Sequence, residues 1–85
     1  MKILYTRNFL KMLRYLPLNI QEKASQKVSI FKKYPFSKTL RTHKLSGKLS
    51  GHYAFSLDYN YRVIFKYIDK STVAFMHIGD HSIYQ

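Results

Sequence analysis

The side chains best suited to proton chemistry in this chain are four histidines, because the unperturbed pKa of histidine lies near 6.5. His43 and His52 flank a repeated tetrapeptide in the stretch THKLSGKLSGH, while His77 and His81 lie near the C-terminus. Such a stretch can be a flexible linker, a phosphate-binding loop or the rim of an active site. The residues around it must decide between these three interpretations.

The repeat matches neither a Walker A loop nor a linker. Leu49 follows Gly47 and Lys48, where a Walker A loop has Ser or Thr, and Thr42 occupies the position of the upstream glycine. A Gly/Ser tether would not carry leucines at regular spacing. We therefore expect an ordered, basic loop in which Leu45 and Leu49 pack onto the core and the glycines permit tight turns.

No metal or cofactor is expected. The chain has no cysteine, which excludes disulfides and thiolate metal sites. His43 and His52 are nine positions apart, and His77 and His81 have no accompanying acid at a helical spacing. Neither pair therefore matches a known metal motif.

The net charge of +11 is concentrated in the first part of the chain. Residues 1–48 hold twelve Lys and Arg against the single acid Glu22, whereas residues 49–85 hold three of each sign. A half-molecule with this imbalance favours a polyanion or an acidic protein as partner, and nucleic acid is the leading candidate.

Length and hydropathy predict one soluble domain. With 46% hydrophobic residues, including eight Tyr and six Phe, the 85 residues can form one compact core, so a single domain over residues 1–85 is expected. No apolar run approaches the roughly 18–20 residues of a membrane span, and the N-terminal apolar patch is too short for a signal peptide. We expect a cytoplasmic protein that does not interact with membranes.

A short strand at residues 2–6 precedes the first of two amphipathic helices. Thr6 or Asn8 can cap this first helix, and Pro17 stops it. The helical spacing rests on Phe9, Met12, Leu13 and Leu16.

The second helix is expected to open at Asn19, with Glu22 as its capping-box partner, and to end at Pro35. A connection of two or three residues makes the two helices an antiparallel hairpin. The apolar stripe of the second helix consists of Ile20, Ala24, Val28 and Phe31.

From residue 53 the apolar period changes to two, which predicts a three-stranded antiparallel meander. The aromatic face of the meander should pack on the helix hairpin, and alternation places His77 on this face. The other face carries Ser56, Arg62 and Lys66 and should look outward. The fold class is therefore α+β: an N-terminal strand, a helix hairpin, then the meander.

The layout HKLSGKLSGHYAFSLDYNYRVIFKYI…FMHIGDHSIY resembles the RelE/ParE superfamily of bacterial toxins, nearest the YafQ-like branch. The resemblance covers nearly the whole chain. Each motif alone is weak, but together, in order and at close to the family's spacing, they are fairly specific. They are His43-x-Leu45-x-Gly47, Gly51, the strand YRVIF and the ending Ile78-Gly79-x-His81-x-x-Tyr84.

The resemblance implies a RelE-like fold and the toxin of a type II toxin–antitoxin system. Such toxins are typically endoribonucleases that enter the A site of the 70S ribosome, cut the mRNA there and are inhibited by a cognate small acidic antitoxin. Two alternatives share the fold: a ParE-like topoisomerase poison and a non-catalytic module that binds the ribosome or RNA. The presence of the His, Arg and aromatic residues favours the nuclease.

The resemblance also assigns roles within metal-free RNA cleavage, which needs a base, an acid and positive charge at the phosphate. His81 matches the C-terminal histidine that acts as acid, and His43 matches the first histidine and is the candidate base. Arg62 matches the strand arginine at the scissile phosphate, or else it orders the C-terminal tail. Tyr84 matches the terminal aromatic that contacts a base, or else it caps the core.

This chain departs from the YafQ-like pattern at two positions. Ser56 and Asn60 stand where those relatives have a second histidine and an aspartate, and neither serves as an acid or base near neutral pH. The proton chemistry then falls on His43 and His81. RNA phosphates are expected to contact Lys11, Lys23, Lys27, Lys32, Lys33, Lys44, Lys48 and Lys66.

Overall fold

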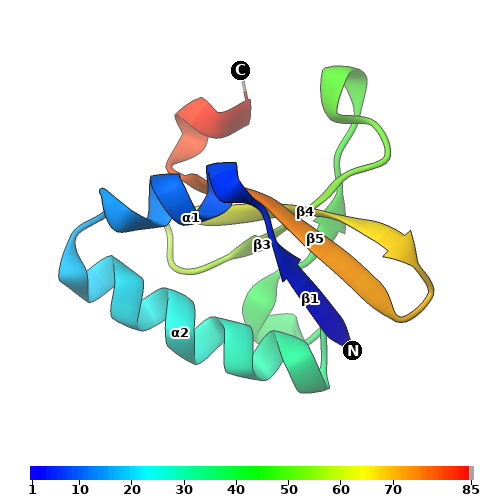
Figure 1. The fold of residues 1–85 in the computed structure, drawn as a ribbon, viewed down its shortest axis with the longest axis horizontal. Coiled ribbons are helices and arrows are strands. Elements are labelled where there is room, and N and C mark those ends of the chain that lie inside the picture. Colours follow the sequence, from blue (N-terminus) through cyan, green and yellow to red (C-terminus); the bar gives the residue numbers. More distant parts are fainter. Residues whose placement is uncertain (85) are drawn as a thin grey trace.

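The computed structural model describes residues 1–84 and contains a five-stranded sheet covered by two helices (Figure 1). The strand order is β1-β5-β4-β3-β2, in which β1 runs parallel to β5 and the other neighbours are antiparallel. The strands are β1 (Lys2–Tyr5), β2 (His43–Lys44), β3 (Tyr53–Ser56), β4 (Arg62–Asp69) and β5 (Thr72–Gly79). The predicted α+β architecture is confirmed, and β2 adds a short strand that was not expected.

The helix hairpin is formed by α1 (Arg7–Arg14) and α2 (Leu18–Lys33), joined through residues 15–17. Figure 1 shows the two helices running back along each other and packing on the sheet. Thr6 caps α1, because its Oγ1 accepts a hydrogen bond of 3.1 Å from the backbone amide of Phe9. No helix within residues 1–84 is long and apolar enough to cross a membrane.

The predicted capping box of the second helix is wrong. The helix begins at Leu18 directly after Pro17, and no side chain caps it. The carbonyl of Pro17 accepts hydrogen bonds from the amides of Ile20 and Gln21, both at 3.0 Å. Proline fixes its own φ, here −55°, and its carbonyl begins the helical hydrogen bonds, so this end forms without Glu22.

Four phenylalanine rings form the centre of the core. Phe31 of α2 lies 4.8 Å from Phe55, 4.8 Å from Phe65 and 5.4 Å from Phe75, measured between ring centroids. All four side chains are fully buried. The aromatic face of the sheet therefore packs on the helices, as the alternating pattern predicts.

The placement of His77 on that face is wrong, because β5 contains a bulge. The β4–β5 register pairs Ile64 with His77 but Phe65 with Phe75, so Met76 is an extra residue in β5. One added residue exchanges the two faces of a strand beyond it. Ile78 consequently joins the core cluster, and His77 lies beside Ile64 on the opposite face.

The opposite face is also less open than the sequence suggested. Its central residues Ala54, Ile64 and Ala74 are buried, and Ser56 is only 8% exposed. This face is therefore not a flat cationic surface. The cations at its margins are half-buried, as Arg62 is.

The loop containing the repeat is ordered but is not anchored as predicted. Gly47 (φ 66°) and Gly51 (φ 88°) adopt the left-handed conformation that glycine allows, which agrees with the expected tight turns. Leu45 and Leu49 are only half-buried and lie outside the core cluster. The fully buried anchor is Leu40, which precedes the repeat.

Phe31→Ala should lower the free energy of unfolding by about 3–5 kcal/mol, because it removes the ring that contacts three strands at once. Urea unfolding followed by circular dichroism measures this loss. Leu18→Ala, on the same helix but 75% exposed, is the matched control and should change the free energy by less than about 0.5 kcal/mol. Equal losses in the two variants would contradict the central position of Phe31.

Candidate functional site

The turn between β3 and β4 holds Arg62 in place through its own backbone. Asp58 Oδ1 accepts hydrogen bonds of 2.9 Å from the amides of Asn60 and Tyr61, which closes the turn. Arg62 Nη1 then donates to the carbonyls of Asp58 (2.8 Å), Tyr59 (3.1 Å) and Tyr61 (3.2 Å). Nη1 of the guanidinium is thus fully used in hydrogen bonds to the turn, and these bonds restrict rotation of the side chain.

An ion pair ties the same turn to α2. Lys23 Nζ lies 3.0 Å from Asp58 Oδ2. Burial alone raises the pKa of the Asp58 carboxyl, but hydrogen bonds from Lys23 and from the amides of Tyr61 and Asn60 outweigh it and lower the pKa. Asp58 is therefore a committed structural anion, and Lys23, which we expected to contact RNA, already has a partner.

A polar cavity of about 260 Å³ lies beside Arg62. The cationic side chains that line it are Arg62, Arg41 and Lys27, and Ser56 contributes its hydroxyl. Ser56 and Arg62 are cross-strand neighbours, which explains why they meet there. Both residues therefore lie on the same face of the sheet, as the alternating pattern predicted.

The C-terminal turn η3 (His81–Tyr84) brings two more of the expected residues to the same end of the sheet. Burial raises the pKa of the Tyr84 hydroxyl, while the charge of Arg62 and a hydrogen bond from it act in the opposite direction. Arg62 therefore lies close enough to Tyr84 to act on its hydroxyl. The His81 ring is exposed and lies 6.1 Å from the Tyr84 ring, between centroids.

His43 lies on the far edge strand β2 and does not line the cavity beside Arg62. Its Nδ1 lies 2.9 Å from the carbonyl oxygen of Arg41 and must donate the proton, since a carbonyl only accepts. The exposed ring therefore keeps Nε2 free. The register places His43 level with Ala54 of the neighbouring strand.

The eight lysines expected to contact RNA are spread over several elements. Those on the helices are Lys11 of α1 and Lys23, Lys27, Lys32 and Lys33 of α2, while Lys44, Lys48 and Lys66 lie in β2, η2 (Gly47–Leu49) and β4. Lys27 is half-buried beside Arg62, whereas Lys44 and Lys48 are exposed. The structure therefore brings only one of them to the cavity.

Solved structures with the same architecture come from bacterial toxins. A "YoeB/ParE toxin" from Agrobacterium tumefaciens is 15% identical, with a TM-score of 0.79 over 95% of this chain and 99% of that one. YafQ from Escherichia coli is 18% identical, with a TM-score of 0.71 over 98% and 96%. This chain has the YoeB/YafQ toxin fold.

Further matches include YafQ within the E. coli DinJ–YafQ complex, which is 20% identical, with a TM-score of 0.67 over 96% of this chain and 94% of that one. No family model and no curated protein sequence matches the chain. The fold implied by the sequence resemblance is thus confirmed in three dimensions, where sequence comparison alone finds no match.

On this toxin fold, two features of the site were not foreseen. Arg41 was absent from the expected site residues, although it lines the cavity beside Arg62. Its backbone is left-handed (φ 51°), which a sequence pattern does not reveal for an arginine. The pairing of Lys23 with Asp58 spans 35 positions and likewise has no local signal.

His52 and His77 form a second histidine pair within the toxin fold. His52 Nδ1 is buried without a hydrogen-bond partner among residues 1–84. Asn8 Nδ2 donates to the carbonyl of Met76 (3.0 Å) and lies 2.9 Å from Nδ1 of His77. Because Nδ1 then accepts, this contact favours neutral His77.

Burial lowers the pKa of His77, and positive charge on His52 lowers it further. The folded state therefore disfavours the proton that an unfolded histidine binds near pH 6.5. The resulting stabilisation is complete above about pH 6.5 and is lost as the pH falls below it.

His77→Gln should flatten the pH dependence of the free energy of unfolding between about pH 7.5 and about pH 5.5. Glutamine keeps an acceptor for Asn8 but cannot titrate. Urea unfolding of both proteins across this range measures the two slopes. Parallel slopes would show that His77 does not carry the effect.

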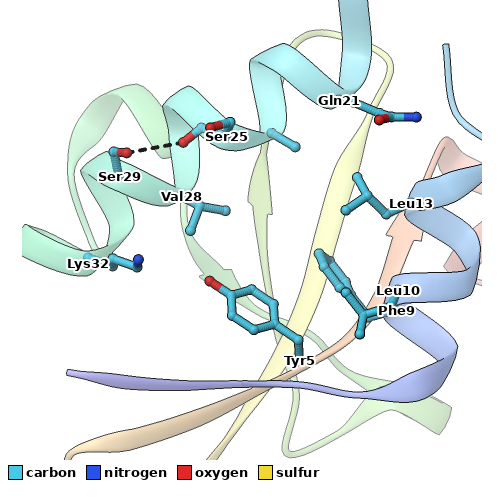
Figure 2. Close-up of a pocket in the computed structure, with 10 residues that line it drawn as sticks. Tyr5, Phe9, Leu10, Leu13, Gln21, Ser25, Val28, Ser29 and Lys32 are labelled. Atoms are coloured by element: carbon cyan, nitrogen blue, oxygen red, sulfur yellow. Dashed lines mark hydrogen bonds between the residues drawn. The ribbon is translucent and has the colours of Figure 1, made fainter. Parts of the chain in front are cut away.

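An apolar groove lies between β1, α1 and α2, with a volume of about 320 Å³ (Figure 2). Figure 2 shows Tyr5 and Leu10 on one side, with Val28 and Lys32 of α2 on the other. Tyr5 is 42% and Leu10 is 45% exposed, so both offer apolar surface to a partner. The adjoining surface of α1 carries Arg7, Lys11 and Arg14.

Proposed function

We propose that this chain is the toxin of a type II toxin–antitoxin system, with residues 1–85 forming a single toxin domain. Its activity is ribosome-dependent endonucleolytic cleavage of mRNA in the A site, without a metal. The observation that carries the proposal is that Arg62, which lines the cationic cavity, also lies beside Tyr84 of the turn that contains His81. The toxin fold and the positive charge agree with it.

The proposed reaction is an attack of the RNA 2′-oxygen on the adjacent phosphorus. A base takes the 2′-hydroxyl proton, the phosphorus bond to the 5′-oxygen breaks, and an acid protonates that oxygen. The products are a 2′,3′-cyclic phosphate end and a 5′-hydroxyl end. Positive charge must meet the extra negative charge that develops on the phosphate in the transition state.

We assign the acid to His81, the base to His43 and the charge to Arg62. The free Nε2 of His43 can accept the 2′-hydroxyl proton, and the exposed His81 can reach the leaving oxygen. Two strands separate β2 from β5, so the backbones stand about 14 Å apart, and the scissile phosphate must lie between the rings. Tyr84 then stacks on or orients a base.

His81→Ala should lower the cleavage rate by about 10²–10⁴-fold, because the leaving oxygen loses its proton donor. Primer extension on translating ribosomes measures cleavage, with folding checked by circular dichroism. His52→Gln is the matched control, since it removes a histidine outside the proposed machinery.

Full cleavage by a folded His81→Ala protein would overturn the assignment of the acid. A parental protein that leaves mRNA intact but inhibits gyrase would instead favour the ParE-like alternative, which shares the fold. Binding to ribosomes with neither effect would favour a non-catalytic module.

The partner in this proposal is an acidic antitoxin that binds the groove of Figure 2 with an amphipathic segment. The groove has an apolar floor that includes the buried ring of Phe9, and Lys32 stands at its margin. Acidic side chains flanking an apolar stripe complement this arrangement. The matched structures of the YoeB–YefM and DinJ–YafQ complexes agree with an antitoxin partner.

Leu10→Ser together with Lys32→Glu should weaken binding of the acidic product of the adjacent reading frame by at least about 10-fold, the loss expected when apolar contact and charge attraction disappear together. Isothermal titration calorimetry measures the affinity. Lys70→Glu, at the exposed β4–β5 turn, is the control with one reversed charge. An unchanged affinity in the double variant would exclude the groove.

A further inference from the structure

Two cations without partners face the cavity beside Arg62. Arg41 reaches it from the residue after η1 (Lys38–Leu40), and Lys27 reaches it from α2. Among residues 1–84 the one ion pair is Lys23 with Asp58, and neither cation donates a side-chain hydrogen bond there. Two elements distant in sequence thus bring positive charge to one cavity.

The charges around the cavity do not balance. Asp58 is the one carboxylate that lines it within the described part of the chain. Its Oδ2 pairs with Lys23 and its Oδ1 accepts two backbone amides, so it is not available to Arg41 or Lys27. Arg41 is exposed and Lys27 is half-buried; like charges that line one cavity repel, and an anion placed between them relieves this repulsion.

The backbone of Arg41 supports the same interpretation. Arg41 is the sole non-glycine residue with positive φ in residues 1–84. Its amide donates to the carbonyl of Lys38 at 3.3 Å, and its carbonyl accepts the proton on His43 Nδ1. Glycine would adopt this backbone conformation at no steric cost. An arginine at a position with this strain therefore indicates that its side chain has a function.

We propose that this cavity is an oxyanion site that binds a phosphate group of a polynucleotide, with Arg41 and Lys27 making the direct contacts. Guanidinium grips phosphate oxygens bidentately, and the ammonium of Lys27 adds a point charge. The hydroxyl of Ser56 can complete the site, while Arg62 supports its wall from the turn. The inference deepens the proposed function by naming two residues that hold the RNA backbone, and it relies on that function for the identity of the polynucleotide.

A short single-stranded oligonucleotide made of 2′-deoxynucleotides tests this site, because it cannot be cleaved by attack of a 2′-hydroxyl. Arg41→Gln and Lys27→Gln should each weaken its binding by roughly 10-fold, as expected when a charge-assisted hydrogen bond is lost. Each should also reduce the slope of log affinity against log salt by about 0.7. Lys38→Gln removes an exposed positive charge nearby and should bind like the parental protein.

Inorganic phosphate is the second probe, because it carries the same chemistry without a nucleic acid chain. NMR spectra should show the Arg41 Nε–H signal shifting on titration with either probe, and a much tighter response to the oligonucleotide identifies a polynucleotide site. An equal response to both, scaled per phosphate, would indicate a site for free phosphate and overturn the proposed ligand.

Equal losses in Arg41→Gln, Lys27→Gln and Lys38→Gln would overturn the inference, because only net charge would then matter. Unchanged binding in the first two variants, both folded by circular dichroism, would also overturn it. The outcome is separable from that of the proposed function. If the parental protein leaves mRNA uncut on ribosomes, the proposed function fails and the phosphate site still stands. If the parental protein cuts mRNA but its Arg41→Gln variant binds the oligonucleotide normally, the phosphate site fails and the proposed function still stands.

Discussion

The ring of Phe31 is stacked on Phe55 and meets Phe65 and Phe75 edge-on, so one side chain of α2 contacts β3, β4 and β5 together. A domain of 85 residues without a disulfide has few other means of fixing a sheet against a helix. This contact fixes β3, β4 and β5 against α2. Arg62 begins β4 and His81 follows β5, so the candidate site depends on the core for its shape.

A second constraint acts at the surface of the same helix. Lys23 and Asp58 join α2 to the β3–β4 turn, and the turn in turn immobilises the guanidinium of Arg62. A half-exposed ion pair adds little to stability by itself. Its importance lies in geometry, because it joins α2 to the turn whose carbonyls hold the guanidinium of Arg62.

The sequence indicated the α+β order, the helix hairpin and the aromatic core face, because these depend on local periodicity. It also indicated Arg62 and Tyr84, through motifs at both ends of the meander. The bulge at Met76 moved His77 off the core face, and a bulge has no reliable local pattern. Leu40 and Arg41 were missed for a related reason, since an isolated turn between η1 and β2 has no period to read.

Neither the periodicity of the sequence nor the register of the strands assigns a chemical role to His43 or His81. Both rings are exposed, and a phosphate must lie between them before their task is defined. In the proposed reaction the ligand lies between β2 and the turn after β5, so the ligand sets the positions of both rings as much as the fold does. Core positions, by contrast, are defined by their neighbours in the chain itself.

The parallel pairing of β1 with β5 has a consequence for how the protein is made. Lys2 lies opposite Thr72 and Tyr5 opposite Phe75, so the first of the five strands cannot form its sheet hydrogen bonds until the last has been made. A chain is synthesised from its N-terminus onward, and contacts of such long sequence separation form late. The β1–β5 pairing therefore forms only after β5 has been synthesised. Until then the backbone groups of β1 that later pair with β5 must hydrogen-bond to water.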